Sequence, residues 1–454
     1  MKKLLWIVVL LGVGLAFPVS NLFITRKTDS ALRANVKDAR LEKVVAIFEQ
    51  KCLDCHSDKA ALPFYANLPV ASSIIAKDIQ RGTQALNASQ DCFGPTPANE
   101  AMLAKIQRVV ETGSMPPKDY RLMHWGSGLT GEDKAALMTW IRFARAQANG
   151  ETDGNHPLFA SPVLPLVAPK GLNPEKVALG RKLYHDNRLS GDNTLSCASC
   201  HDLKKGGTDQ AQYSTGIRGQ KGGINAPTTF NAIHAFVQFW DGRAADLQAQ
   251  AAGPVANPIE MGAKWEDVPA KLKADKEYAD AFAKLYPEGI TKDNITDAIA
   301  VFEKSLVTVN SRFDQFLRGK ANALTADEQE GYRLFMADGC YTCHAGQALG
   351  GKSFERFSRY GDYFAERGNP TPADDGRFAV TKIESDRHKF KVPTLRNVAI
   401  TFPYLHDGST SDLAKVVKLM GRYQFHSDLP DNDVALVVKF LKTLTGELDG
   451  KPLE

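Results

Sequence analysis

The sequence contains no dense run of lysine and arginine, and beyond its first residues it carries no net charge. Residues 1–27 hold four basic residues and no acidic residue, which accounts for the whole formal charge of +4. The rest of the chain is therefore neutral overall, and a basic surface for nucleic acid is not expected.

The sequence also lacks the sustained alternation of apolar and polar residues that a large sheet would need. Helix signals are frequent instead. Asn173 followed by proline is typical of a helix start, and Thr325 with Glu328 has the pattern of a capping box. Apolar residues recur at helical spacing in residues 434–441. We predict a mainly α protein, divided into domains because 454 residues exceed a single core.

Charged side chains are absent from residues 4–25, a length sufficient to cross a bilayer as a helix. Lys2 and Lys3 precede this stretch, as expected if the N-terminus stays in the cytoplasm. A cleaved signal peptide is the alternative, but no clean small-residue cleavage site follows. We predict a transmembrane anchor at residues 1–27, and both interpretations put residues 28–454 outside the cytoplasm.

Cysteine is scarce, and its few copies are patterned. Six of the seven cysteines form three C-x-x-C pairs, and each pair is followed at once by histidine: CLDCH, CASCH and CYTCH. This pattern is typical of covalent haem c attachment, in which the thiols bind the vinyl groups and the histidine binds iron. A zinc site would need the pairs to come together, and a thioredoxin-like motif has no reason to carry the histidine three times. We predict three haem c groups, attached at Cys52, Cys55, Cys197, Cys200, Cys340 and Cys343. The seventh cysteine, Cys92, is expected to be a buried thiol.

The three histidines of these motifs, His56, His201 and His344, lie 145 and 143 residues apart. Such regular spacing predicts three haem-bearing units. Four prolines stiffen the stretch after residue 156. We therefore predict three cytochrome c-like haem domains preceded by one transmembrane helix. Their bounds are 28–156 for the N-terminal monohaem domain, 157–172 for a linker, and 173–318 and 319–454 for the other two domains.

The second axial ligand of each iron decides whether that haem carries electrons or reacts. After the first motif the choice lies among Met115, Met123 and His124. We favour Met115 because it precedes proline in a glycine-containing loop. After the third motif, Met420 lies 76 residues beyond His344, on a predicted amphipathic helix where methionine is more often core than ligand.

The second motif is ambiguous. Met261 lies 60 residues after His201, so spacing alone would allow it to ligate the iron. It directly follows Glu260, however, and a carboxylate beside a haem is the acid/base group that peroxide chemistry needs. Spacing leaves both interpretations open.

From about Asn173 to the C-terminus the sequence resembles the bacterial dihaem cytochrome c peroxidases. The N-terminal part resembles a separate small haem-binding domain through CLDCHSD and MPPKDYRLMH. Together they resemble the membrane-bound trihaem peroxidases that take electrons from quinol. The matching C-terminal stretches are LGRKLYHDNRLSGDNTLSCASCHD, STGIRGQKGGINAPTTFN, QFWDGRAADLQAQAAGP, FMADGCYTCH, GRFAVTK, PTLRNVAITFPYLHDG and KLMGRYQF.

The resemblance implies a role for four residues around the middle motif. His201 would hold the peroxidatic haem, and Glu260 would be the acid/base residue on its distal side. Gln250 would orient peroxide. Trp240 would lie between two haems as an electron bridge.

The resemblance also implies an electron-transfer haem with His344 and Met420 as its iron ligands. Asn225, with the carbonyls of Thr401 and Pro403, would bind a calcium ion. Oxygen donors of this kind suit a hard cation.

One departure from the family pattern concerns the loop that reads STGH in many dihaem members. Residues 214–217 read STGI here, and the isoleucine Ile217 cannot ligate iron. We predict an open or water-bound haem at His201 in the oxidised protein. His234 is an alternative ligand, although a structural role is expected for it. Related enzymes that oxidise a partner protein's tryptophan have a tyrosine in place of the methionine ligand. Met420 argues against that activity in this protein. Tyr423 lies three residues further on, so a tyrosine ligand stays an alternative.

The sequence thus predicts a membrane-anchored trihaem peroxidase on the periplasmic side of the bacterial inner membrane. It would reduce H2O2 to water with electrons from quinol. A soluble cytochrome c is the alternative donor, and a multihaem electron carrier without catalysis is the alternative function. Monomeric and homodimeric forms are both compatible with the residues.

Overall fold

The computed structural model describes residues 19, 21, 33, 39–57, 62, 64–88, 92, 93 and 99–454. The anchor predicted at residues 1–27 lies outside this part of the chain apart from Val19 and Asn21. Within the described residues, no helix combines the length and the apolar character needed to span a membrane. The chain divides into two compact units, Met1–Pro162 (unit 1) and Val163–Glu454 (unit 2). The boundary lies inside residues 157–172.

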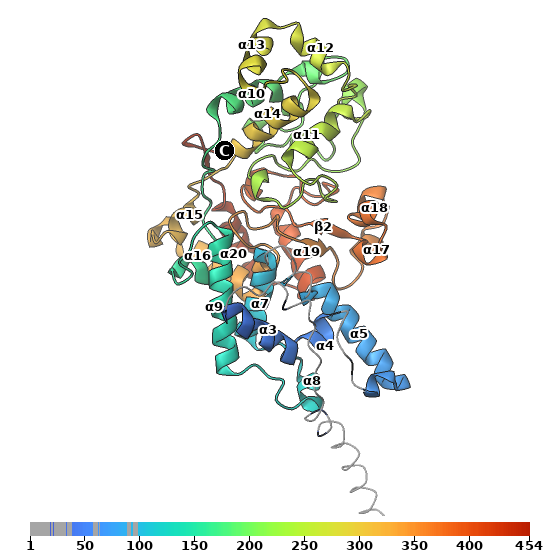
Figure 1. The fold of residues 1–454 in the computed structure, drawn as a ribbon, viewed down its shortest axis with the longest axis vertical. Helices are drawn as coiled ribbons and strands as arrows, with labels where there is room; N and C mark the ends of the chain where they lie inside the picture. Colours follow the sequence, from blue (N-terminus) through green and yellow to red (C-terminus); the bar gives the residue numbers. More distant parts are fainter. Residues whose placement is uncertain are drawn as a thin grey trace, which may run out of the picture. The chain divides into compact units, whose positions relative to one another are not determined.

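Both units are built mainly from helices, as predicted. Figure 1 shows these elements along the chain. The helices of unit 1 are α3 (Ala39–Lys51), α4 (Leu53–His56), α5 (Pro69–Ala85), α7 (Glu100–Thr112), α8 (Lys118–Met123) and α9 (Gly131–Ala148), with 3-10 turns η1 (Phe64–Asn67) and η2 (Pro157–Ala160).

The core of unit 1 lies between α3, α7 and α9. Apolar residues of the three helices meet there, among them Phe48, Ile106 and Trp140. Asn99 caps α7 and Thr130 forms a capping box at the start of α9, so the sequence itself fixes where these helices begin. Cys92 is buried in the same core.

Unit 2 contains the remaining helices and two small antiparallel sheets. Its helices are α10 (Pro174–Tyr184), α11 (Leu247–Ala256), α12 (Val268–Lys273), α13 (Lys276–Leu285), α14 (Lys292–Ser305), α15 (Arg312–Leu317), α16 (Ala326–Asp338), α17 (Tyr363–Arg367), α18 (Phe378–Thr381), α19 (Leu413–Phe425) and α20 (Asp431–Lys442). Strand β1 (Phe354–Arg356) pairs with β2 (Lys389–Lys391), and β3 (Glu447–Leu448) pairs with β4 (Lys451–Pro452).

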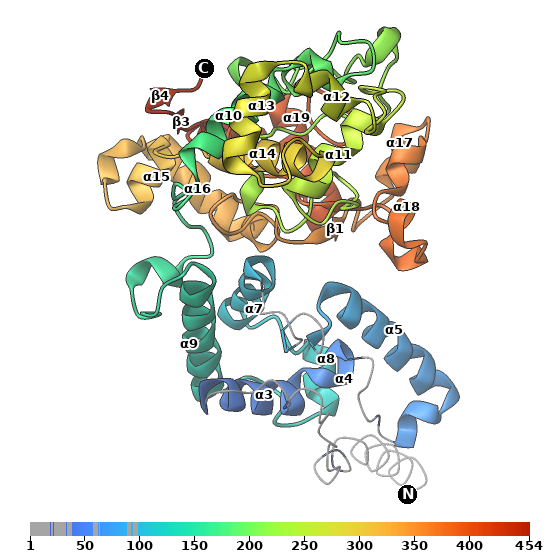
Figure 2. The same ribbon diagram turned by 45° about the horizontal axis from the view of Figure 1, so that its top comes forward.

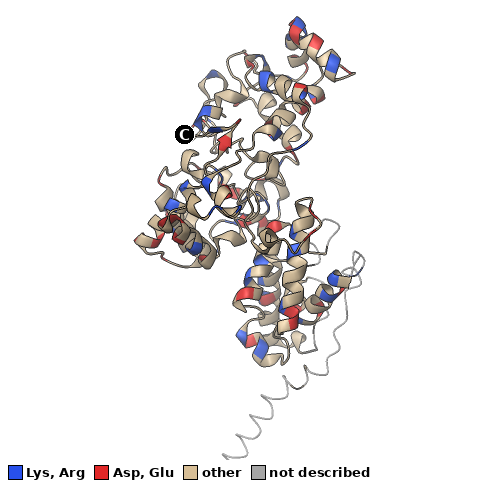
Figure 3. Cartoon of the chain, turned by 90° about the vertical axis from the view of Figure 1, so that its left-hand side faces the viewer, with Lys and Arg blue, Asp and Glu red and all other residues tan. Residues whose placement is uncertain are grey.

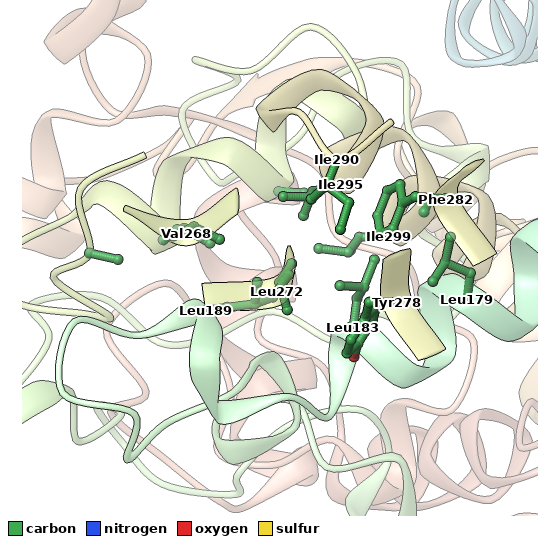
Figure 4. Packing of buried hydrophobic residues seen from close by; sticks show 14 of the residues in the cluster. Leu179, Leu183, Leu189, Val268, Leu272, Tyr278, Phe282, Ile290, Ile295 and Ile299 are labelled. Atoms are coloured by element: carbon green, nitrogen blue, oxygen red, sulfur yellow. The ribbon is translucent and has the colours of Figure 1, made fainter. Parts of the chain in front are cut away.

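Two lobes make up unit 2. The first lobe, residues 173–318, gathers α10 to α14, drawn green to yellow in Figures 1 and 2. Its apolar core joins α10, α12, α13 and α14 (Figure 4). The second lobe, residues 319–454, is built around α16, α19 and α20. We use these two names below.

The same close helix crossing occurs in each lobe. A Cβ on Gly180 of α10 would lie 1.9 Å from the carbonyl oxygen of Ala298 on α14. A Cβ on Gly331 of α16 would lie 2.0 Å from the carbonyl oxygen of Leu436 on α20. Only glycine permits such an approach. In both lobes the helix that leads towards a C-x-x-C-H motif is therefore held against the last long helix.

Buried polar contacts join the two lobes. The guanidinium of Arg396 pairs with the carboxylate of Asp314 at 2.9 Å, and both side chains are fully buried. Nearby, Thr308 bonds to the side chains of both Asn231 and Asn397. Truncating one partner of a buried ion pair costs about 3–5 kcal/mol, so these contacts fix how the lobes meet.

Lys and Arg residues are interspersed with Asp and Glu residues along the ribbon of both units (Figure 3). This mixture of signs is in keeping with the neutral composition.

Candidate functional site

A cavity of about 960 Å³ lies inside unit 2. It is lined from both lobes, and this volume is at the upper end of the range for ligand pockets. Thirteen of the predicted site residues border it: Cys197, Cys200, His201, Asn225, Trp240, Gln250, Glu260, Cys340, Cys343, His344, Thr401, Pro403 and Met420.

The three C-x-x-C-H motifs share one local conformation. In each, the backbone N–H of the histidine donates to the carbonyl of the first cysteine, at 3.1 Å for His56 and 3.0 Å for both His201 and His344. Each ring also places Nδ1 against a backbone carbonyl: Leu86 at 2.9 Å, Gly207 at 3.3 Å and Leu349 at 3.1 Å.

This arrangement suits an imidazole that binds iron. A carbonyl can only accept, so Nδ1 carries the hydrogen and Nε2 keeps its lone pair. Metal-binding histidines are oriented in the same way by an outer hydrogen bond. None of the seven cysteines forms a disulfide bond. In unit 2, the thiols of the two motifs border the cavity and are placed for attachment of a prosthetic group.

Glu260 and Gln250 approach the cavity from the first lobe. Gln250 lies on α11, and Glu260 follows the turn after that helix. The Asn257 side chain donates to Glu260 Oε1 at 2.8 Å. Burial raises the pKa of Glu260, while Arg243 and the Asn257 hydrogen bond partly oppose this shift. A raised pKa makes the carboxylate a stronger base, which favours a role in proton transfer.

The neighbour of Glu260, Met261, is buried in the apolar core of the first lobe. It also borders the cavity. Two adjacent residues therefore face different surroundings, since the carboxylate is bonded by an amide and the thioether is packed among hydrocarbon side chains.

Ile217 occupies the position of the missing histidine, and it is buried with 3% exposure. Its backbone N–H donates to the carbonyl of Glu260 at 2.7 Å, and Gln220 donates to the carbonyl of Pro258 at 2.9 Å. A Cβ on Gly216 would lie 1.9 Å from the carbonyl oxygen of Ile259. The loop is thus held tightly against the Glu260 turn. Ile217 itself does not border the cavity, although Gly216 does.

Trp240 lies where the two lobes meet. Its indole N–H donates to the carbonyl of Asn225 at 2.9 Å, and its own carbonyl accepts from the N–H of Lys391 at 2.8 Å. The ring packs edge-on against Phe390 and His406 of the second lobe. It therefore contacts both lobes and borders the cavity between them.

The predicted calcium ligands also line this cavity. Asn225 donates through Nδ2 to the carbonyls of Ala211 and Gln212, which orients its Oδ1 as an acceptor. Thr401 and Pro403 of the second lobe line the same cavity. Within the described residues, no cluster of three or more His, Cys, Asp or Glu side chains could hold a metal. A cation at this place would be bound by neutral oxygens, which calcium accepts.

Comparisons with known proteins identify the kind of site. Residues 174–322 match the family "Di-haem cytochrome c peroxidase", and residues 16–143 match the family "Haem-binding domain". The cytochrome c peroxidase Ccp of Escherichia coli K12 is 44% identical over 409 residues, which are 89% of this chain and 88% of that protein.

The chain belongs to the di-haem cytochrome c peroxidase family. A cytochrome c551 peroxidase of Nitrosomonas europaea is 45% identical over 287 residues, covering 63% of this chain and 84% of that one. Among solved structures, a MauG-like protein associated with microbial copper homeostasis superposes with a TM-score of 0.56 at 32% identity, covering 63% of this chain and 93% of that one.

As a member of the di-haem peroxidase family, the protein is a haem peroxidase that carries covalently bound haem c and acts on H2O2. The shared conformation of the motifs fits this cofactor.

Family membership does not account for a buried acidic side chain in the peroxidase cavity. Glu303, in the last turn of α14, borders the cavity near Cys197, and its Oε2 has no hydrogen-bond partner among the described residues. Burial raises the pKa of Glu303 to about 8. Its burial could not be predicted from the sequence, because a glutamate on an amphipathic helix is usually exposed.

A buried polar network lies next to Trp240 and was not predicted from the sequence. His406 bonds through Nε2 to Asp374 at 2.7 Å, and Arg367 pairs with both Asp374 and Asp407 at 2.6 Å. Burial would raise the pKa of Asp374, but the hydrogen bonds from Arg367 and others outweigh it and lower the pKa to about 2. Two of these residues, His406 and Asp407, belong to the stretch PYLHDG, which is the only part of the network that the sequence singles out.

In unit 1 the candidate sixth ligands have different surroundings. Met115 and Met123 are 40% and 38% exposed. Both ring nitrogens of His124 are already engaged, Nε2 with the hydroxyl of Tyr65 and Nδ1 with the carbonyl of Tyr120, each at 3.0 Å. His124 is therefore the least suited of the three to bind iron.

Proposed function

We propose that the protein is a membrane-anchored trihaem peroxidase that reduces H2O2 to two waters with electrons from quinol. It would act on the periplasmic side of the bacterial inner membrane. The observation that carries the catalytic part is the meeting of Glu260, Gln250 and His201 at one cavity, which also receives His344 and Met420 from the other lobe.

The chemistry requires two electrons and two protons for each H2O2. When bound at His201, haem c supplies the iron at which the O–O bond is cleaved. Glu260 takes the proton from one oxygen of peroxide and returns it to the departing oxygen, and its raised pKa suits both transfers. Gln250 holds the peroxide in line by hydrogen bonding, which contributes orientation rather than chemistry.

Ile217 supports the proposal that the iron at His201 is open when oxidised. It offers no ligand atom, and its loop is held against the Glu260 turn by the Ile217 N–H and by Gln220. His234 does not border the cavity; burial lowers its pKa to about 4. We assign it a structural role, and we assign Met261 to the apolar core.

The second lobe is proposed to hold the electron-transfer haem, with His344 and Met420 as ligands. Tyr423 is the residue that an enzyme oxidising tryptophan would use, but its hydroxyl donates to Glu366 at 2.7 Å, and it does not border the cavity. Trp240 would carry electrons between the lobes. Calcium at Asn225, Thr401 and Pro403 would stabilise the contact between the same two lobes.

Electrons are proposed to enter through a third haem in unit 1, attached at Cys52 and Cys55 and ligated by His56 and Met115. The extra haem-binding region and the apolar N-terminal stretch support quinol as donor. A soluble cytochrome c is the alternative.

The test compares three proteins in detergent: the wild type, Glu260→Gln, and Cys52→Ala/Cys55→Ala, which cannot attach the first haem. We expect peroxide-dependent oxidation of a quinol analogue by the wild type only. Turnover of the cysteine variant with reduced cytochrome c should persist. Equal, negligible peroxide turnover by the wild type and Glu260→Gln would instead identify an electron carrier.

A further inference from the structure

One basic side chain at the cavity of unit 2 is enclosed and isolated. Among the described residues, three lysine or arginine residues border this cavity. Arg243 pairs with Asp241 at 3.1 Å, and Arg356 is exposed. Lys391, at the end of β2, is surrounded by protein, and its Nζ has no hydrogen-bond or ion-pair partner among the described residues. An ammonium group removed from water without a partner is costly, and burial accordingly lowers the pKa of Lys391 to about 8.

The backbone of β1 and β2 places Lys391 on the side of the cavity that holds the second-lobe motif. Its own N–H donates to the carbonyl of Trp240 at 2.8 Å. Two residues further on, the backbone of Pro393 lies within hydrogen-bonding reach of the His344 imidazole. The carboxylate of Glu355, on the paired strand β1, interacts electrostatically with the same imidazole. Lys391 is therefore beside Trp240 and close in the fold to His344.

The described residues supply no anion for this ammonium group. Glu303 is the other isolated charge at the cavity, but burial is the cause of both pKa shifts and neither group acts on the other. Haem c carries propionate groups, and attachment at Cys340 and Cys343 brings them into the cavity that Lys391 borders. A carboxylate in such surroundings needs a cation or several hydrogen bonds. A propionate and Lys391 would therefore each supply what the other lacks.

We propose that Lys391 binds a propionate of the haem c attached at Cys340 and Cys343, and that its positive charge raises the reduction potential of this haem. The inference rests on the haem proposed at that motif. Oxidised iron carries more positive charge than reduced iron, so a nearby cation disfavours the oxidised form. Lys391 thereby favours an electron resting in the second lobe, next to the Trp240 backbone.

The test is a spectroelectrochemical titration of the haems in the full-length holoprotein in detergent micelles. Lys391→Met keeps the length of the side chain and removes its charge. We expect the midpoint potential of the haem at His344 to fall by about 59 mV, which is a tenfold change in the ratio of reduced to oxidised haem. Lys391→Arg keeps the charge and should retain the wild-type potential. Lys391→Gln is a second uncharged variant, for use if the methionine variant does not fold.

The haem at His344 is recognised in the titration by a separate variant. Methionine ligation raises the potential of a haem, so the step that moves strongly in Met420→His belongs to this haem. The matched control for the charge is Lys389→Met, two residues earlier on β2. Lys389 pairs with Asp386 at 3.1 Å and does not border the cavity, so its loss should leave the potentials unchanged.

The outcomes separate this inference from the proposed function. If the uncharged variants keep the wild-type potential, or if only the potential of the haem at His201 falls, the assignment of Lys391 is wrong while the haem stands. An equal fall in Lys391→Arg would overturn the role of the charge. A holoprotein without haem at Cys340 and Cys343, as measured by mass spectrometry of its peptides, overturns both this inference and the proposed electron-transfer haem.

Discussion

The two lobes of unit 2 are built on one plan and differ in the side chains that they place at the cavity. In each, a helix approaches the motif and crosses the last long helix at a glycine, Gly180 in the first lobe and Gly331 in the second. The helix opposite then presents Phe302 to the first glycine and Phe440 to the second. The scaffold therefore does not distinguish the proposed reactive haem site from the proposed electron-carrying one.

The difference lies in a few side chains at the cavity. The first lobe contributes the carboxylate of Glu260, and the second contributes the thioether of Met420. One residue after each phenylalanine, the first lobe has Glu303 and the second has Leu441, and both border the cavity. Chemistry is thus assigned by side chains on a repeated frame, and each of the following changes tests one of these differences.

Removing the acid/base group should have the largest effect. Glu260→Gln keeps the size and the amide contact but cannot exchange a proton, so peroxide turnover should fall by about 10²–10⁴-fold. The reduction potential of the second-lobe haem should not move. Glu266→Gln, an exposed neighbour, is the control. If Glu260→Gln turned over peroxide as fast as the wild type, the proposed difference between the lobes would be wrong.

Glu303 should make the stability of the first lobe depend on pH. Its folded pKa of about 8 lies above the unfolded value, so its contribution is fully present below about pH 4 and is lost as pH rises through 8. The free energy of unfolding should fall by about 1.4 kcal/mol per pH unit in that window. Glu303→Gln should flatten the profile, as measured by denaturant unfolding of the holoprotein. If the pH dependence of the free energy of unfolding did not change, the Glu303 carboxyl would be ionised in the folded protein.

Asp374 should give the second lobe the opposite dependence. Its pKa is lowered to about 2, so its contribution is present above about pH 4 and is lost as pH falls through 2, a change of about 2 kcal/mol. Asp374→Asn should remove this acid-side loss while lowering stability at neutral pH, because Arg367 loses a partner. Acid titration followed by near-UV circular dichroism measures both, and a variant as stable as the wild type at pH 7 would contradict it.

Ile217→His should make the first lobe resemble the second by offering its iron a sixth ligand. If the new histidine binds the iron in nine-tenths of the molecules, only one-tenth can bind peroxide. The oxidised enzyme should then react with peroxide about tenfold more slowly. Prior reduction by one electron should restore the rate. Ile217→Val is the control of similar shape. A histidine variant as fast as the wild type would show that the loop cannot reach the iron.

The motifs and their partners could be predicted from the sequence because each is a short local pattern. The C-x-x-C-H turns, the cap at Asn173 and the helix of Met420 all depend on neighbouring residues. The resemblance to dihaem peroxidases added Glu260, Gln250 and Trp240, which the cavity brings together with residues far along the chain.

Some residues could not be predicted from the sequence, because their burial and hydrogen bonding depend on residues far away in the chain. In the sequence, Glu303 has the pattern of an ordinary polar residue on an amphipathic helix. Its carboxyl is buried only because α14 packs beside the cavity. Asp374 and His406 are 32 residues apart and meet through the fold. The stack of Tyr120 on His124 likewise needs the helix α8 to be in place before the contact exists.

The most direct measurement is the EPR spectrum of the resting, fully oxidised protein. The proposed difference between the lobes predicts a high-spin ferric signal from the haem at His201, where Ile217 offers no ligand atom, together with low-spin signals from the haems proposed to be ligated by Met115 and Met420. A spectrum that is low-spin throughout would contradict the open site and with it the proposed roles of Ile217 and Glu260.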